Sequence, residues 1–278
     1  MKKNIERFLY FLVYSNIYLA VGAACITTSF LILLNAPFDL MAPFVYFSLV
    51  FFLYTINRYT DKLEDKINYP SRLEFFRRYG KYILIFSSLL FIFSLVLLFS
   101  VNLNSFFIFL VPFILVLFYS VFRLKKIFFM KNIIVATGWA TIPFFIFAQS
   151  HFLLSIYAVF TLFLFLFFRV LLGSIFFDIK DVTGDKIYKI RTIPSRWGIK
   201  KTKYVLHSFN FIASFVLILG YLLQYLNALV ILPSLIMIYT FFCIQLIGKF
   251  DIRTLCDLLV DGDGIILLML VLASVLIW

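Results

Sequence analysis

A short stretch near residue 60 places oxygen-bearing side chains at a spacing suited to binding metal. It reads "NRYTDKLED" and holds Asn57, Asp61 and Asp65 at positions i, i+4 and i+8. On a helix these three side chains share one face. Carboxylate and amide oxygens are hard ligands, and such ligands suit Mg²⁺.

A second acidic stretch, "DIKDVTGD", repeats this arrangement further along the chain. Asp178, Asp181 and Asp185 are spaced i, i+3 and i+7, again on one face if a helix continues through them. Proteins usually bind Mg²⁺ through one or two carboxylates together with substrate phosphates. If the two stretches face each other, they would hold two ions on one diphosphate.

Solvation of charged helix ends is the simpler interpretation of either stretch alone. The two stretches together hold six of the 13 acidic residues, which are five Asp and Glu64 of the first stretch. Like charges repel at short range, so such crowding favours a cation between them. The pair of stretches therefore predicts metal binding.

Basic residues near these stretches are candidates to bind the diphosphate, because Arg and Lys pair well with phosphate oxygens. They are Arg123, Lys125, Lys126, Lys131 and Arg191. Of these, Lys125 and Arg191 are the preferred candidates. Alternatively, these residues only mark the cytoplasmic side of the membrane and bind no substrate.

Composition shows what kind of chain must position these residues. Of 278 residues, 64% are hydrophobic and 14% charged, and the mean hydropathy is +1.07. Typical soluble domains are about 45–50% apolar and about 25% charged. We therefore expect an all-α, polytopic membrane protein, because lipid offers no partner to open backbone groups. We expect one domain over residues 1–278.

Apolar runs of roughly 17–25 residues are long enough to span a bilayer. Nine candidate spans lie near 8–34, 40–56, 82–101, 103–122, 132–149, 152–177, 204–225, 228–248 and 264–278. The second is at the short limit and the ninth is below it. No small-residue cleavage site accompanies the first run, so we expect it to stay as a membrane helix.

The connections between these spans alternate between nearly uncharged and basic. Of 25 Lys and Arg residues, 24 fall in the basic set, and the exception is Arg169. Because Lys and Arg favour cytoplasmic loops, we expect the N-terminus inside and the C-terminus outside. The membrane is predicted to be a bacterial inner membrane. The net charge of +12 is then mostly a topology signal, and no nucleic-acid partner is expected.

Cysteine and histidine offer no second metal site. Cys25, Cys243 and Cys256 are scattered, and His151 and His207 stand alone. Neither set has the spacing of a zinc or disulfide site.

The two acidic stretches resemble the motifs of the UbiA family of intramembrane prenyltransferases. "NRYTDKLED" is similar to that family's N-D-x-x-D-x-x-x-D. "DIKDVTGD" followed by "KIRTIPSRWG" is similar to D-x-x-D-x-x-G-D and the Lys-Thr-Leu-Pro…Gly run after it. The nine-helix plan around a central cavity matches across essentially the whole chain.

This resemblance implies Mg²⁺-dependent transfer of an isoprenyl chain from a polyprenyl diphosphate to an acceptor. It assigns the metal ions to the residues that match the two motifs: Asn57, Asp61, Asp65, Asp178, Asp181 and Asp185. Among these, the catalytic candidates are Asp61, Asp65, Asp178 and Asp181. Arg191 stands where the family often has Lys and would contact the diphosphate.

Two departures from the family pattern bear on the site. Arg58 replaces an Asp, which removes one ligand candidate and adds a cation for the diphosphate. Lys189 replaces a Gly before the Lys-Thr-Leu-Pro run. The acceptor stays open among an aromatic acid, a quinone precursor, a tetrapyrrole, a glycerol phosphate ether and a sugar phosphate.

Three further residues have two interpretations each. Arg169 lies in the sixth span, and an Arg within the membrane is a functional candidate. It could bind a carboxylate of the acceptor or pair with a residue of another helix. We expect the pairing. Tyr54 and Tyr119 are expected in the interfacial belt rather than in a cavity wall.

Two rival functions differ in chemical class. A secondary transporter also uses acidic residues on membrane helices, but transporter sites usually lie near the midplane on broken helices. A CDP-alcohol phosphotransferase carries its Asp motif in a single stretch with Gly and Arg at set places, which this sequence lacks.

Overall fold

The computed structural model describes residues 2–60, 62–121, 127–151 and 153–278. Within these ranges the chain is helical and has no strand. The long helices are α1 Lys2–Tyr14, α2 Ile17–Leu33, α3 Met41–Thr60, α5 Pro70–Val101, α6 Leu103–Val121, α7 Met130–Ala140, α9 Ile156–Ile187, α10 Ile193–Leu222, α12 Ile236–Leu246 and α14 Asp263–Ile277. The short elements are α4 Lys62–Asn68, α8 Ile142–Gln149, η2 Ala228–Val230, α11 Ile231–Ser234, α13 Ile252–Thr254 and the π-helix η3 Leu255–Val260.

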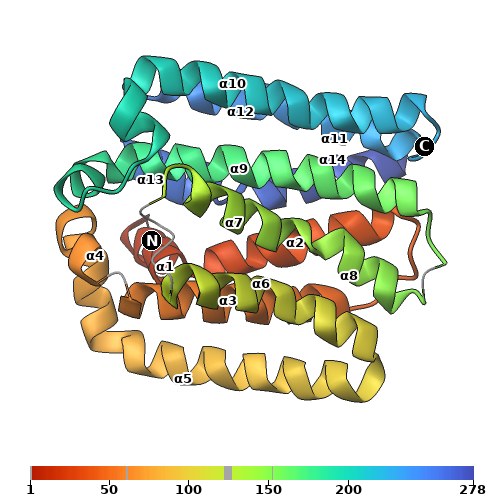
Figure 1. Ribbon diagram of the computed structural model, residues 1–278, viewed down its shortest axis with the longest axis horizontal. Helices are drawn as coiled ribbons and strands as arrows, with labels where there is room; N and C mark the ends of the chain where they lie inside the picture. The colour runs from red at the N-terminus through yellow and green to blue at the C-terminus, as the bar shows by residue number, and fades with distance from the viewer. Residues whose placement is uncertain (1, 61, 122–126, 152) are drawn as a thin grey trace.

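The helices pack side by side into a closed ring. α2 packs on α3, α3 on α5, α7 on α9, α9 on α10, and α10 on α12. The ring closes where α14 packs on α2, which joins the end of the chain to its beginning. In Figure 1, α4 and the turn between α9 and α10 lie at one end of the bundle, and the C-terminus lies at the other.

The predicted multi-pass membrane architecture is confirmed, although the number of spans is approximate. Seven helical segments of the described chain are long and apolar enough to cross a membrane. An eighth is added if α1 and α2, bent by 71° at their junction, form one span. The described apolar part of α6, Leu103–Leu117, is shorter than these. The bundle is therefore close to the nine-span plan.

Several predicted loops are helical. α9 runs on through the second acidic stretch to Ile187, and the last apolar segment extends from Ile252 to Ile277 rather than starting at 264. The prediction ended each span at its charged residues. Those charges face the inside of the ring, so the helices continue through them.

Large apolar side chains also cover the outside of the bundle. Leu89 and Phe93 on α5, Phe211 and Leu222 on α10, and Leu276 on α14 are exposed. In water such a surface would be unfavourable, whereas hydrocarbon solvates it well. The outer faces of these helices therefore fit contact with lipid.

The contact that closes the ring depends on a pair of glycines. Gly22 lies in α2 and Gly264 in the first turn of α14. A Cβ added at Gly264 would lie 2.4 Å from the carbonyl oxygen of Gly22. Real Cβ atoms do not approach backbone so closely, so a larger residue would push the two helices apart.

We predict that Gly264→Ala lowers the stability of the detergent-solubilised protein by about 1–3 kcal/mol, the usual effect of overpacking. Gly173→Ala is the matched control. A Cβ there would meet only Val260 Cγ1 at 3.9 Å, an ordinary contact, and alanine favours a helix over glycine. Thermal unfolding measures both variants. Equal melting temperatures would contradict the close α2–α14 contact.

Candidate active site at the charged end of the bundle

The helical ring encloses a cavity of about 330 Å³ that both acidic stretches line. Asn57, Arg58 and Asp65 contribute from the first stretch, and Asp181 and Asp185 from the second. Much of the remaining wall is aliphatic or aromatic and comes from α3, α6, α7 and α9. The prediction that the two stretches face each other therefore agrees with the geometry.

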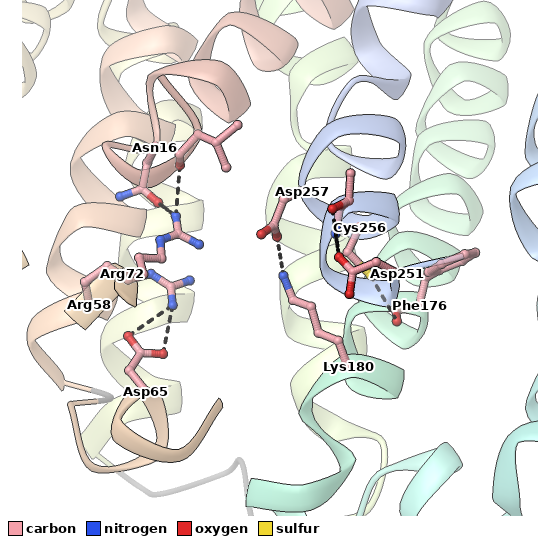
Figure 2. Close-up of polar contacts among 11 residues, drawn as sticks. Asn16, Arg58, Asp65, Arg72, Phe176, Lys180, Asp251, Cys256 and Asp257 are labelled. Atoms are coloured by element: carbon pink, nitrogen blue, oxygen red, sulfur yellow. Dashed lines mark hydrogen bonds and ion pairs between the residues drawn. The ribbon is translucent and has the colours of Figure 1, made fainter. Parts of the chain in front are cut away.

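The first stretch is divided between two helices. Asn57 and Arg58 lie in the last turn of α3, whereas Asp65 lies in α4. Arg58 Nη1 donates to both carboxylate oxygens of Asp65, at 3.1 and 3.2 Å, as Figure 2 shows. Asp61 is outside the described residues. Asp65 of α4 is thus paired with Arg58 of α3.

The second stretch lies on one continuous helix, and its first carboxylate is deeply buried. Asp178 is 0% exposed. Lys131 Nζ donates to Asp178 Oδ1 at 2.7 Å, and Asn132 Nδ2 donates to Oδ2 at 2.8 Å. Both donors come from α7, so this carboxylate fixes α7 against α9. Lys131 lines the cavity, and Asp178 lies behind it.

The other two carboxylates of the second stretch are in different environments. Asp185 Oδ2 accepts from Thr192 Oγ1 at 2.9 Å, and Thr192 also forms the capping box that begins α10. Asp181 Oδ1 is buried, and no hydrogen-bond partner for it is found in the described part of the chain. A buried carboxylate oxygen without a partner is costly unless something else binds it. Asp181 is therefore the side chain most in need of a ligand.

A glycine brings the two stretches together. Asn68, at the end of α4, accepts a hydrogen bond from the backbone N–H of Gly184 through Oδ1, at 3.2 Å. A Cβ at Gly184 would lie 2.5 Å from Asn68 Nδ2. The glycine of "DIKDVTGD" is thus needed for α4 to approach α9.

The donor set fits Mg²⁺ only when a substrate supplies further oxygens. Among the described residues, no three acidic, histidine or cysteine side chains lie close enough to hold an ion by themselves. Asp65 on one wall and Asp181 and Asp185 on the other each offer hard oxygen to the cavity. Because Mg²⁺ takes one or two carboxylates and completes its shell with water and phosphate, this arrangement fits an ion bound with a diphosphate.

The remaining predicted residues are placed as follows. Arg191 is exposed at the turn between α9 and α10 and is not among the residues that line the cavity. Lys125 and Lys126 fall outside the described residues. Tyr54 lines the cavity and lies 3.4 Å from Trp139 Nε1, so its expected place in the interfacial belt was wrong.

Comparisons with known proteins give the family. The model of the UbiA prenyltransferase family matches residues 17–254. The chain belongs to the UbiA prenyltransferase family. No curated protein matches the sequence significantly. The chain is therefore an enzyme, a membrane prenyltransferase, and the transporter interpretation is set aside.

Solved structures of UbiA homologues share the fold. A structure of a UbiA homologue from Archaeoglobus fulgidus bound to GPP and Mg²⁺ superposes with a TM-score of 0.68 at 14% identity, covering 96% of this chain and 99% of that one. A digeranylgeranylglyceryl phosphate synthase matches with a TM-score of 0.60 at 21% identity, covering 98% of both chains. A UbiA homologue from Aeropyrum pernix K1 has a TM-score of 0.63 at 13% identity, covering 97% and 98%.

Several polar residues in the wall of this UbiA cavity were not singled out from the sequence. They are Asn68, Arg72, Lys180, Asp261 and Asp263. Lys180 lies inside "DIKDVTGD", between Asp178 and Asp181. The stretch "DLLVDGDG" at 257–264 carried a usable signal, because three acids open an otherwise apolar helix.

Arg169 forms the expected interhelical pair. Its guanidinium donates to Asp263 at 2.5 Å, to Asn210 Oδ1 at 3.0 Å and to Thr240 Oγ1 at 2.9 Å. These partners come from α14, α10 and α12. Arg169 is 5% exposed, so the charge is satisfied by three other helices within the bundle.

We predict that Arg169→Met destabilises the protein by about 3 kcal/mol, because Asp263 would be left as a largely buried, unpaired charge. In Arg169→Met/Asp263→Asn that charge is gone, and most of the loss should be recovered. A double-mutant cycle of unfolding in detergent measures the coupling. If the two single losses simply add in the double variant, the pair does not provide the stability assigned to it.

Proposed function

We propose that the protein transfers an isoprenyl chain from a polyprenyl diphosphate to an acceptor within the membrane, with Mg²⁺ as cofactor. The observation that carries this proposal is that Asp65 on α4 and Asp181 on α9 line the same cavity. The cavity continues from these carboxylates into an apolar chamber among the helices. A diphosphate head and a hydrocarbon tail would each meet a matching environment.

Cationic side chains that now pair with carboxylates would bind the diphosphate of the donor instead. Arg58 and Lys131 now neutralise Asp65 and Asp178. An incoming diphosphate offers these cations stronger acceptors, since hydrogen bonds between charged groups are short and strong. Asn57, Asp61, Asp65, Asp178, Asp181 and Asp185 are proposed to hold the metal. When bound, Mg²⁺ would neutralise charge on the leaving diphosphate.

The apolar wall would protect the reacting carbon. Phe165 and Leu166 on α9 and Leu49 on α3 line the cavity beyond the charged residues. They would bury the isoprenoid and keep water from the allylic cation that develops as the diphosphate departs. Tyr54 and Trp139 also line the cavity, and their ring faces are suited to a nearby cation. Lys125, Lys126 and Arg191 remain proposed diphosphate contacts.

Binding of geranylgeranyl diphosphate to the detergent-solubilised protein tests this proposal. We expect binding with Mg²⁺, loss with EDTA, and at least about a tenfold weakening in Asp65→Asn and Asp181→Asn. Asp251→Asn is the matched control, because Asp251 is an exposed acid whose carboxylate bonds Thr254 in its own turn. If folded protein binds the diphosphate equally well with Mg²⁺ and with EDTA, and both aspartate variants bind it as wild type does, the proposal is refuted.

We also propose that the charged end of the bundle faces the cytoplasm of a bacterium, with the C-terminus outside. The basic residues of the turn after α9 lie at the end opposite the C-terminus in Figure 1. Cytoplasmic loops favour Lys and Arg. A C-terminal alkaline phosphatase fusion should therefore be active and a C-terminal green fluorescent protein fusion dark. The reverse pattern would place the active site on the outer face.

A further inference from the structure

A third acidic stretch lies in the cavity wall and belongs to neither family motif. "DLLVDGDG" carries Asp257, Asp261 and Asp263 where the last membrane segment begins. Asp257 pairs with Lys180 at 2.5 Å, and Asp263 pairs with Arg169. Asp261 differs from both, because no hydrogen bond or ion pair to its side chain is found within the described ranges. Its carboxylate lines the cavity.

The helix is irregular just before Asp261. η3, from Leu255 to Val260, is a π-helix, and the N–H of Asp261 donates to the carbonyl of Cys256 at 3.0 Å. Two tyrosines hold this segment: Tyr18 Oη donates to Leu258 O at 3.0 Å, and Tyr239 Oη to Leu259 O at 2.8 Å. Short π-segments inside α-helices are frequent at functional sites. Here the segment directs Asp261 into the cavity.

A buried cation with unused donors lines the same cavity. Arg72, at the start of α5, is 7% exposed. Its Nη2 donates to Asn16 Oδ1 at 2.5 Å and to Val13 O at 3.2 Å, both neutral oxygens, as Figure 2 shows. Its Nε is buried and has no partner among the described residues. No carboxylate of the described chain lies within ion-pair distance of it.

These two groups belong to one polar region of the cavity. Arg72 and Asp261 line the same cavity, together with Arg58 and Lys180. In Figure 2, Arg72 and Arg58 lie on one side of a gap, and Asp257 and Lys180 on the other. A guanidinium with spare donors and a carboxylate with a free acceptor suit a ligand that carries both an anionic group and a hydroxyl. An isoprenoid tail has neither.

We propose that Arg72 and Asp261 form the acceptor subsite, with Arg72 binding an anionic group of the acceptor and Asp261 its nucleophilic hydroxyl or ring position. This inference rests on the proposed prenyl transfer. A bond forms between the nucleophilic oxygen or carbon and the first prenyl carbon. The bond from that carbon to the diphosphate breaks, and its electron pair leaves with the diphosphate. The proton displaced from the nucleophilic atom passes to Asp261.

The test separates the donor from the acceptor. Arg72→Gln and Asp261→Asn are compared with Arg77→Gln, an exposed arginine one turn further along α5, and with Asp251→Asn. One arm measures Mg²⁺-dependent binding of geranylgeranyl diphosphate. The other arm measures binding of two anionic probes, 4-hydroxybenzoate and geranylgeranylglyceryl phosphate. It also measures binding of their neutral counterparts, methyl 4-hydroxybenzoate and geranylgeranylglycerol. In this arm the donor is replaced by its non-transferable thiolodiphosphate.

We expect donor binding within about twofold of wild type in both variants. Wild type should bind one anionic probe at least about tenfold more tightly than its neutral counterpart, and Arg72→Gln should remove that preference. Asp261→Asn should still bind the probe. When geranylgeranyl diphosphate itself is supplied with Mg²⁺, this variant should transfer the prenyl group at least about 100-fold more slowly than wild type, the usual effect of losing a general base. Both control variants should behave as wild type.

Four results would overturn the proposal. These are no binding of any probe, a bound probe that wild type does not prenylate, weaker donor binding in Arg72→Gln, or normal transfer by Asp261→Asn. The third would assign Arg72 to the donor diphosphate instead. If Arg72→Gln does not fold, Arg72→Lys keeps the charge and should keep the preference for the anionic probe. Failure of wild type to bind the donor with Mg²⁺ would refute prenyl transfer itself.

Discussion

Charge placed inside a membrane protein must be neutralised by charge on another part of the chain. Water is absent from the hydrocarbon core, so an unpaired ion there is expensive. Among the described residues, four carboxylates around the cavity each pair with a cation. The pairs are Arg58–Asp65, Lys131–Asp178, Lys180–Asp257 and Arg169–Asp263. Two of them, Lys131–Asp178 and Arg169–Asp263, join different long helices, and Lys180–Asp257 joins α9 to η3, so these pairs also hold the ring closed.

The same pairing keeps the site ready for a highly charged substrate. A diphosphate with its metal ions brings both signs of charge, and each sign finds a partner that is already in place. Two of the buried polar groups without a hydrogen-bond partner among the described residues lie where ligands are proposed. Asp181 Oδ1 lies beside the proposed donor site, Arg72 Nε lies in the wall near η3, and Asp261 lines the same cavity. The apolar wall then shields the hydrocarbon tail of the donor from water.

Sequence alone predicted the class of fold and the two motifs because both depend on local spacing. The long apolar runs could only be membrane helices, and Asp178, Asp181 and Asp185 share a face because α9 continues through them. The helix ends were harder to predict, since a charge in an apolar run looks like a loop until its partner is known. Asp263 was missed for this reason, because its partner Arg169 is 94 residues away.

The first motif shows a second limit of prediction from sequence. Asn57 and Asp65 have helical spacing and lie in α3 and α4. The bonds from Arg58 to both oxygens of Asp65 depend on side-chain placement, which spacing alone does not give. Arg72 had no motif and could be found only once the ring had brought α5 to the same cavity as η3.

The proposed donor site requires the two acidic stretches to hold metal ions on one diphosphate. A structure of the protein with Mn²⁺ and geranylgeranyl thiolodiphosphate, with the metal located by its anomalous scattering, tests this requirement. We predict metal within bonding distance of Asp181 and of an acid of the first stretch, with diphosphate oxygens completing each shell. Metal held elsewhere, or a diphosphate bound by cations alone while Asp181 remains free, would contradict it.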